Sequence, residues 1–273
     1  MPETQTPKSV PDLLKLIAKY GKRSVLVSGV DASNTPSGKV VIDMSGVEPL
    51  NEIEVKRDKV TIGTGMNLGR LVRDASGANG LLRQAASLIA NPLVRNRVTV
   101  VEALSLESPY FDITTPLVLL DAKIKLQSPS AKRTLSIRDY LEAATKGLKK
   151  AEIPTTIEFA ALAPDKKVGF FRVARMGGKG TVSAAASMKL VRTVCKEPEI
   201  VVSSLTLVPL RARQAEKEIV DKPANEASIK RASVLAAEEI LARSEKGNPY
   251  ERTLIEIAVA RTLRTIMEGT MPM

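Results

Sequence analysis

The chain has no histidine, no tryptophan and a single cysteine, Cys195, among its 273 residues. A Ser-His-Asp or Cys-His nucleophilic site cannot be built without histidine, and one cysteine cannot form a disulfide, a zinc site or an iron–sulfur cluster. Any redox centre must therefore be an organic cofactor or must lie on another chain. Because Cys195 ends the apolar run that starts at Leu190, we interpret it as a small buried hydrophobic residue.

Long hydrophobic runs are also missing. No stretch approaches the roughly 20 continuous apolar residues of a membrane span, and the N-terminal sequence MPETQTPKSVPD lacks the apolar core of a signal peptide. With 44% hydrophobic and 26% charged residues, the composition predicts a soluble globular protein of two or three modest domains. We expect it in the cytoplasm, with no membrane as partner.

Aromatic residues make up only 3% of the chain, whereas the net charge is +11. Such a charge is compatible with nucleic acid, an anionic cofactor or an acidic partner subunit. Lysine and arginine are scattered rather than massed, and platforms for base stacking are scarce, so we expect no nucleic acid as partner. A basic solvated surface or a subunit interface is the plainer interpretation, and a nucleic-acid-binding protein remains an alternative that rests on charge alone.

The alternation of apolar patterns predicts three units with boundaries at residues 57/58 and 164/165. The first unit, residues 1–57, is predicted to be a small α/β domain. It has a helix over Pro11 to Tyr20 and strands over Ser24 to Val27 and Lys39 to Met44. A polar loop rich in turn formers, Ser28 to Gly38, separates the two strands, at a place where ligands often bind.

The second unit, residues 58–164, is predicted to be an α+β domain. Its predicted strands cover Val60 to Ile62, Val98 to Val101, Leu117 to Leu120 and Lys123 to Gln127, and its helices Asn67 to Asp74, Leu81 to Ile89 and Ile137 to Ala144. Around Leu148 to Lys167 we predict a connection that contains one further strand.

The third unit, residues 165–273, is predicted to be a three-stranded antiparallel sheet packed on a helical bundle. The strands are predicted at Val168 to Arg175, Val182 to Val191 and Glu199 to Leu207, and the helices at Ala212 to Val220, Glu226 to Arg243 and Tyr250 to Met267. The fold class predicted for the whole chain is therefore α+β.

Three groups of segments resemble one known family. The most specific is Ile89-Ala90-Asn91-Pro92-Leu93-Val94-Arg95-Asn96-Arg97-Val98-Thr99, followed by Ser108 to Asp112 and Leu119 to Ala122. Before it come Ala18 to Gly21, Val25 to Asp31, Val41 to Ser45 and Thr61 to Gly63, and after it Val208 to Ala212 and Tyr250 to Arg252. In this order they resemble the FAD-binding medium subunit of molybdenum hydroxylases, the family of carbon monoxide dehydrogenase and xanthine dehydrogenase.

The resemblance implies a two-part FAD-binding fold with one glycine loop in each of the first two domains. Glycine lets backbone N–H groups approach phosphate oxygens. The family's first loop, A-G-G-T-D, corresponds to Val27-Ser28-Gly29-Val30-Asp31, which retains one of the two glycines. The resemblance makes Ser28, Gly29, Val30 and Asp31 candidate cofactor-binding residues, and Ser33 and Asn34 are further candidate donors.

The family's second loop, T-I-G-G-N, corresponds to Thr99-Val100-Val101-Glu102-Ala103, in which both glycines are replaced. A β-branched Val101 disfavours positive φ, and Glu102 places a carboxylate beside a diphosphate unless its side chain turns away. Val101 and Glu102 are therefore candidate cofactor contacts at a loop that departs from the family pattern.

Three more positions match the family. Thr99 and Asp112 fall where it contributes polar contacts to the dinucleotide, with turn and cap chemistry as the alternative role. Arg172 falls where the family often has Lys near the flavin ring, with a surface cation as the alternative. The run Gly177-Gly178-Lys179-Gly180 lacks phosphate-loop spacing and is interpreted as a hairpin turn.

The resemblance implies an FAD-binding electron-transfer subunit, with a large molybdenum-cofactor subunit and a small iron–sulfur subunit as partners. Electrons pass from clusters on a partner chain to an acceptor, and no metal is expected on this chain. The replaced glycines keep a second hypothesis open, a scaffold protein that retains the fold but has lost the dinucleotide site.

Overall fold

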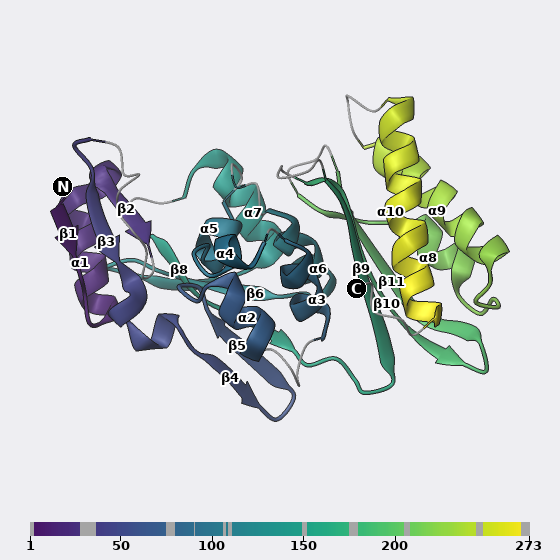
Figure 1. The fold of residues 1–273 in the computed structure, drawn as a ribbon, viewed down its shortest axis with the longest axis horizontal. Coiled ribbons are helices and arrows are strands. Elements are labelled where there is room, and N and C mark those ends of the chain that lie inside the picture. The colour runs from purple at the N-terminus through teal and green to yellow at the C-terminus, as the bar shows by residue number, and fades with distance from the viewer. Residues whose placement is uncertain are drawn as a thin grey trace.

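The computed structural model describes residues 3–27, 37–74, 80–89, 91–105, 108, 111–148, 152–174, 180–204, 208–243 and 248–268 (Figure 1). These residues form three sheets, and each sheet is the centre of one unit of the molecule. The N-terminal unit and the C-terminal unit lie on opposite sides of the middle unit, so the molecule is elongated.

The N-terminal unit is a small parallel sheet with one helix. The strand order is β1-β3-β2, with β1 at Glu3–Gln5, β2 at Ser24–Val27 and β3 at Val40–Asp43. Ser9 caps helix α1 (Val10–Tyr20) by accepting a hydrogen bond from the Asp12 backbone N–H. The buried face of α1 packs on Ile42 of β3, as the predicted α/β character requires.

The middle unit is a five-stranded antiparallel sheet with helices packed against it. The strand order is β4-β5-β8-β6-β7, with β4 at Ile53–Lys56, β5 at Lys59–Gly63, β8 at Ile153–Ala160, β6 at Lys123–Gln127 and β7 at Lys132–Ser136. The helices are α2 (Leu68–Asp74), α3 (Gly80–Leu88), α4 (Pro92–Arg95), α5 (Val100–Ala103), α6 (Thr114–Leu119) and α7 (Ile137–Lys146). The domain boundaries stay predictions. Strand β4 lies before the predicted boundary at residues 57/58, but it pairs with β5, which lies after that boundary.

Two strands predicted for the middle unit were wrong, because one segment leads into a helix and the other lies mostly within one. The segment predicted as a strand over Val98 to Val101 contains the start of α5, where a capping interaction outweighs the β-branched composition. The segment predicted over Leu117 to Leu120 lies mostly in α6, every residue of which is buried. A short continuous apolar run does not distinguish a buried strand from a buried helix.

The C-terminal unit is a four-stranded antiparallel sheet with three helices, whereas the sequence predicted three strands. The strand order is β12-β11-β10-β9, with β9 at Lys166–Ala174, β10 at Gly180–Val191, β11 at Val194–Ser203 and β12 at Leu210–Arg211. The missed strand β12 has only two residues and no periodicity to detect. The helices α8 (Arg213–Ile219), α9 (Glu226–Leu241) and α10 (Pro249–Glu268) follow the predicted ranges closely.

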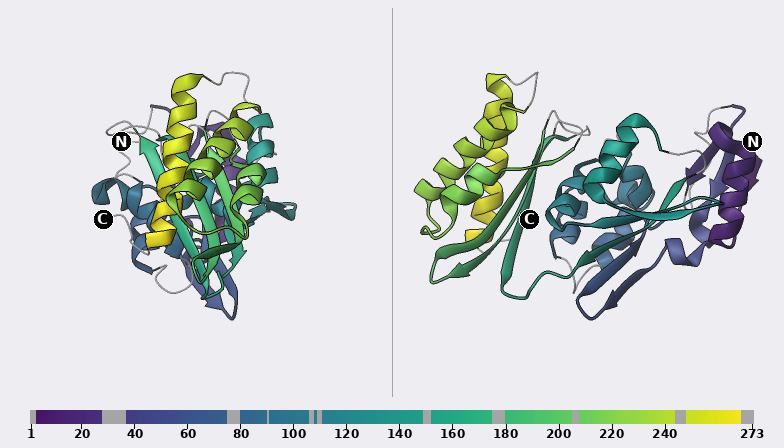
Figure 2. Two further views of the ribbon diagram at one scale, coloured as in Figure 1. Left: turned by 90° about the vertical axis from the view of Figure 1, so that its right-hand side faces the viewer. Right: turned by 180° about the vertical axis from the view of Figure 1, so that it is seen from behind.

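The C-terminal sheet is buried on both faces. Alternate residues of β10, such as Ala184 and Ala186, pack against the three helices, whereas Ala185 packs against the middle unit. Figure 2 shows the helices on the outer side of this sheet and the middle unit on its inner side. Cys195 of β11 is fully buried, as predicted, and burial raises the pKa of its thiol.

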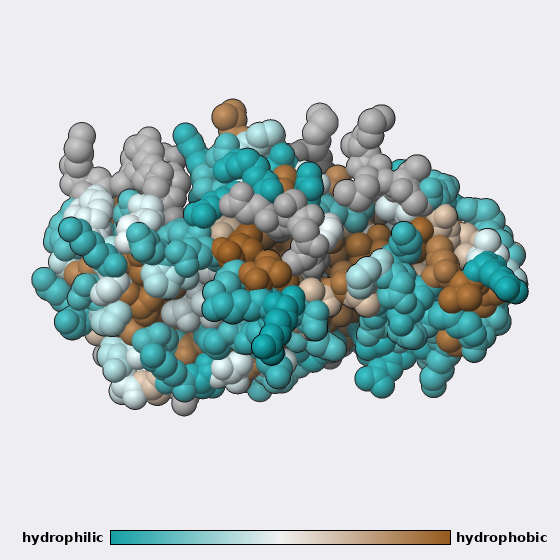
Figure 3. Space-filling view, turned by 90° about the horizontal axis from the view of Figure 1, so that it is seen from below, coloured by the Kyte–Doolittle hydropathy of each residue, from teal (hydrophilic) through white to brown (hydrophobic). Residues whose placement is uncertain are grey.

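The surface is mixed in character. On the face drawn in Figure 3, hydrophobic residues form several separate groups interrupted by hydrophilic ones. Among the helices of the described residues, none is both long enough and apolar enough to cross a membrane.

Candidate functional site

The short helix α5 begins at the loop that the sequence marked as a candidate contact. Thr99, which is fully buried, is its N-cap, and its Oγ1 accepts a hydrogen bond from the Glu102 N–H at 3.3 Å. In return, Oε2 of Glu102 accepts from the Thr99 N–H at 2.7 Å and from the Thr99 hydroxyl at 2.9 Å. This reciprocal arrangement is a capping box, so the Glu102 carboxylate is turned back onto its own helix.

The other N–H groups of the first turn also have acceptors within the chain. Helix starts normally leave four N–H groups without a partner, and these can bind an anion. Here Val100 donates to the Met66 carbonyl at 2.8 Å, Val101 to the Thr64 carbonyl at 2.9 Å, and Ala103 to the Thr99 carbonyl at 3.0 Å. No backbone donor between Thr99 and Ala103 is left over.

The Val101 side chain is partly buried and packs against the hydrophobic cluster of the N-terminal unit, which includes Leu14, Ile42 and Leu50. Val101 itself belongs to the middle unit. The helix start therefore lies at the seam between these two units, where the family resemblance places a dinucleotide.

A second group of predicted site residues comes together where the middle unit meets strand β9 of the C-terminal sheet. Asp112, in the 3₁₀ helix Phe111–Ile113, and Arg172 of β9 form an ion pair in which Nη2 and Oδ2 are 2.8 Å apart. Only 8% of the Asp112 side chain and 11% of the Arg172 side chain are exposed. The contact is one of charges rather than a well-aligned hydrogen bond, since Nη2 has no hydrogen-bond partner in the described part of the chain. Because its side chain is buried, Arg172 is not the surface cation that the sequence left open as its alternative role.

Helix α3 completes this polar cluster from the middle unit. Nη1 of Arg172 donates to the Leu88 carbonyl at 3.1 Å, and Nε2 of Gln84 donates to the Phe170 carbonyl at 3.4 Å. Gln84 is only 3% exposed. Within the described residues, neither Nε of Arg172 nor Oε1 of Gln84 has a hydrogen-bond partner. We define Gln84, Asp112 and Arg172 as the buried polar cluster. Besides the ion-paired Nη2 and Oδ2 atoms, it holds one donor, Nε of Arg172, and one acceptor, Oε1 of Gln84, that the described part of the chain does not satisfy.

The sequence did not single out Gln84. The available signal was its spacing, because Gln84 lies on the same helical face as Leu81 and Leu88 and so had to be buried. Near the cluster, the hydroxyl groups of Thr115 and Ser183 are 2.7 Å apart and also join the middle unit to the C-terminal sheet. The boundary between these two units is therefore polar at several points.

The remaining predicted residues lie outside the described part of the chain. They are Ser28, Gly29, Val30, Asp31, Ser33 and Asn34 of the first loop, together with Gly177, Gly178 and Lys179 of the predicted hairpin turn. Within the described residues, no group of three His, Cys, Asp or Glu side chains is placed to hold a metal ion.

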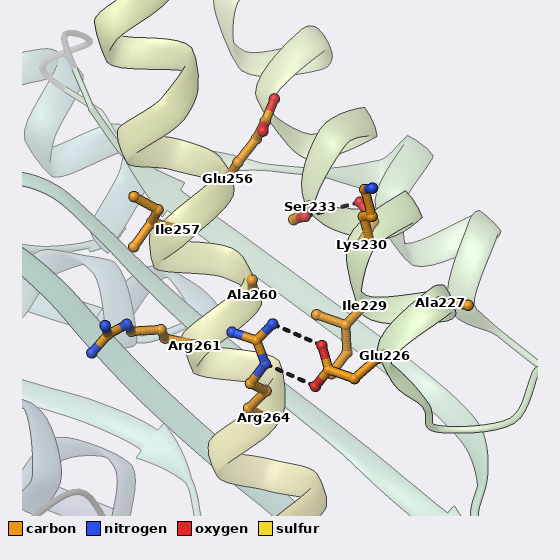
Figure 4. A pocket seen from close by; sticks show the side chains of 10 residues that line it. All are labelled: Glu226, Ala227, Ile229, Lys230, Ser233, Glu256, Ile257, Ala260, Arg261 and Arg264. Atoms are coloured by element: carbon orange, nitrogen blue, oxygen red, sulfur yellow. Dashed lines mark hydrogen bonds and ion pairs between the residues drawn. The ribbon is translucent and has the colours of Figure 1, made fainter.

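A groove of about 540 Å³ lies between α9 and α10 (Figure 4). Arg264 donates two hydrogen bonds to Glu226 across it, at 2.7 and 2.8 Å. Figure 4 shows that Arg261 points away from this pair, and its guanidinium lies 5.2 Å from the centre of the Phe171 ring. Because these helices cover the outer side of the C-terminal sheet, the groove is separate from the buried polar cluster.

Comparisons with known proteins give consistent results. The family model described as "FAD binding domain in molybdopterin dehydrogenase" matches residues 2–160, more than half of the chain. The glyceraldehyde dehydrogenase medium chain of Sulfolobus acidocaldarius is 24% identical, over 83% of this chain and 82% of its own. The carbon monoxide dehydrogenase medium chain of Afipia carboxidovorans is 23% identical, over 85% of each chain.

Solved structures show the same fold. A chain of quinoline 2-oxidoreductase from Pseudomonas putida 86 has a TM-score of 0.84 at 20% identity, over 100% of this chain and 99% of its own. A chain of the cyanide-inactivated Cu,Mo-CO dehydrogenase has a TM-score of 0.83 at 19% identity, over 99% of this chain and 100% of its own. Since the family model covers both sheets that precede residue 160, the chain belongs to the family of FAD-binding domains of molybdopterin dehydrogenases.

Proposed function

We propose that this chain is the FAD-binding medium subunit of a molybdenum hydroxylase complex, in which it passes electrons from iron–sulfur clusters on a partner chain to an acceptor. The family match supports the cofactor, and two relatives named as medium chains align over more than four fifths of this chain. The observation that carries the proposal is the buried polar cluster, because it has unsatisfied groups at the position where the resemblance places the flavin ring.

The unsatisfied groups of the cluster match, in donor and acceptor type, the flavin end of FAD. A flavin ring presents carbonyl oxygens and an N–H group, which require a donor and an acceptor from the protein. Arg172 Nε is an unsatisfied buried donor and Gln84 Oε1 an unsatisfied buried acceptor within the described residues. Asp112 and the Leu88 carbonyl would hold the guanidinium in place. When bound, FAD would supply the electron-transfer chemistry, while the protein contributes position and electrostatics.

The proposal includes two partners, a large molybdenum-cofactor subunit and a small iron–sulfur subunit, in the cytoplasm. The sequence supports this division of labour, because a chain with no histidine and one cysteine cannot ligate an iron–sulfur cluster itself. The molybdenum subunit would then determine the substrate specificity, and this chain would transfer the electrons to the acceptor.

One observation favours a second function. The closed N-terminus of α5 does not fit a diphosphate, as expected of a scaffold subunit that keeps the fold and the partner surfaces without FAD. The two functions differ in flavin content. A stoichiometric flavin supports the electron-transfer subunit, and complete absence of flavin after reconstitution supports the scaffold.

Replacement of Arg172 tests the role of the cluster. We expect the Asp112→Asn/Arg172→Met double variant, which removes both charges together, to bind FAD about 10- to 100-fold more weakly, the value of a hydrogen bond to a charged group. Arg172→Lys keeps a cation at a position where the family often has Lys but loses the Nε donor, so we expect it to weaken binding less than the double variant does. Fluorescence titration with FAD measures both constants, and circular dichroism checks the fold.

The control is Arg261→Met, which removes an exposed guanidinium on the outer side of the C-terminal sheet. It should leave FAD affinity unchanged. If the double variant binds FAD as tightly as the unmodified chain, the buried polar cluster does not hold the flavin.

A further inference from the structure

Val101 and Glu102 replace the two glycines of the second loop, and the structure gives each a role within the chain. Glu102 completes the capping box, since its carboxylate accepts from both the N–H and the hydroxyl of Thr99. This is the arrangement in which the side chain turns away from any diphosphate. The Val101 N–H donates to the Thr64 carbonyl, and the Val101 side chain packs against the hydrophobic cluster of the N-terminal unit.

The N-terminal and middle units also pack closely at a second position, Gly63. Gly63, at the end of β5, lies so close to the N-terminal unit that a Cβ there would be 2.3 Å from the Leu50 carbonyl carbon. The next residue, Thr64, accepts the Val101 N–H, and its own hydroxyl donates to the Pro154 carbonyl at 2.8 Å. Gly63, Thr64 and Val101 thus join α5, β5 and the N-terminal unit without any ligand.

We infer that α5 is a permanent contact between the N-terminal and middle units in this chain, and that none of its backbone N–H groups is donated to a dinucleotide. A diphosphate grip needs N–H groups that point toward the phosphate oxygens. Here each one from Thr99 to Ala103 already has an acceptor in the chain. The inference rests on the proposed function in one respect, because FAD must then be held by the buried polar cluster and by contacts other than α5.

Hydrogen–deuterium exchange of the full chain, with and without FAD, tests this inference directly. We expect the amides of residues 100–103 to exchange slowly in the ligand-free chain and to change by less than about twofold at saturating FAD. Fast exchange without FAD, slowed about tenfold or more by its addition, would show a diphosphate grip and overturn the inference. The two proposals fail separately. If FAD does not bind at all, the proposed function fails, whereas slow ligand-free exchange still supports α5 as a fixed contact.

Variants at the loop give an independent readout. Val101→Ala removes methyl groups that pack on the N-terminal unit, so we expect its Tm to fall by roughly 2 to 4 °C. The matched control is Val191→Ala, at a valine that is 54% exposed in β10, where we expect a shift below about 1 °C. An unchanged Tm for Val101→Ala contradicts the packing role.

The family pattern is restored in the Val101→Gly/Glu102→Gly double variant. If α5 serves only as a contact between units, this variant loses stability and its FAD affinity stays within about threefold of the unmodified chain. A gain in affinity of about tenfold or more would show that the loop faces the dinucleotide, and would overturn the inference.

Discussion

Replacing Asp112 by alanine is expected to lower the free energy of unfolding by about 3 to 5 kcal/mol, because it leaves the buried Arg172 guanidinium without its counter-ion. The pair is 2.8 Å apart and both side chains are about nine-tenths buried, so solvent screens it little. Arg172 cannot lose its proton to relieve the cost. Denaturation by urea, followed by circular dichroism, measures the loss.

The matched control is Asp165→Ala. Asp165 forms an ion pair with Lys189 at 3.5 Å, but its side chain is 63% exposed, so removal should cost less than about 1 kcal/mol. The Asp112→Asn/Arg172→Met double variant should recover much of the stability lost in Asp112→Ala, because no uncompensated charge remains. A cost for Asp112→Ala no larger than that of Asp165→Ala would show that the pair is solvated in solution.

Gly63→Ala is the second substitution with a large expected effect. Its Cβ would lie 2.3 Å from the Leu50 carbonyl carbon and 2.4 Å from the carbonyl oxygen, closer than van der Waals contact permits. Since these are backbone atoms, relief requires the N-terminal unit to shift against the middle unit. We expect a loss of about 3 kcal/mol, at the upper end of the usual cost of overpacking. Thermal and urea denaturation measure it.

Alanine substitutions at two other glycines serve as controls, because the added Cβ would meet a side chain at Gly69 and nothing at Gly80. A Cβ at Gly69 would lie 2.1 Å from Oδ1 of Asn96, but that side chain can rotate, so Gly69→Ala should cost less than Gly63→Ala. Gly80, at the start of α3, has nothing within 4 Å of the added atom, and Gly80→Ala should be neutral or slightly stabilising. Equal stability of all three variants would contradict the tight seam at Leu50.

The elements predicted best from the sequence are those with long, clear periodicity. Helices α9 and α10 and strand β6 were found nearly residue for residue, because their apolar positions repeat over several turns or alternate cleanly. The error at α5 was avoidable, since Thr99 and Glu102 have the spacing of a capping box. Strand β12 could not be predicted from the sequence, because it has only two residues and is defined by its pairing with β11 in the folded sheet.

The candidate site was predicted in parts rather than as a whole. The resemblance placed Asp112 and Arg172 near one cofactor, and the structure brings these two side chains together across two units. It could not reveal that they pair with each other, or that Gln84 of α3 donates to the Phe170 carbonyl of the same strand, because both facts depend on how the middle unit packs on β9. At Thr99 the structure shows the cap role. The assignment of Thr99, Val101, Glu102, Asp112 and Arg172 to FAD stays a prediction.

We propose that this chain works as the FAD-binding subunit of a three-chain complex. The most direct measurement is the visible absorbance spectrum of the protein purified from its native source with whatever chains accompany it. We expect a flavin spectrum, with about one flavin per chain, overlaid on iron–sulfur absorbance from a small partner, and a large molybdenum-containing chain in the same complex. Recovery of a lone colourless chain that takes up no flavin on reconstitution would contradict it.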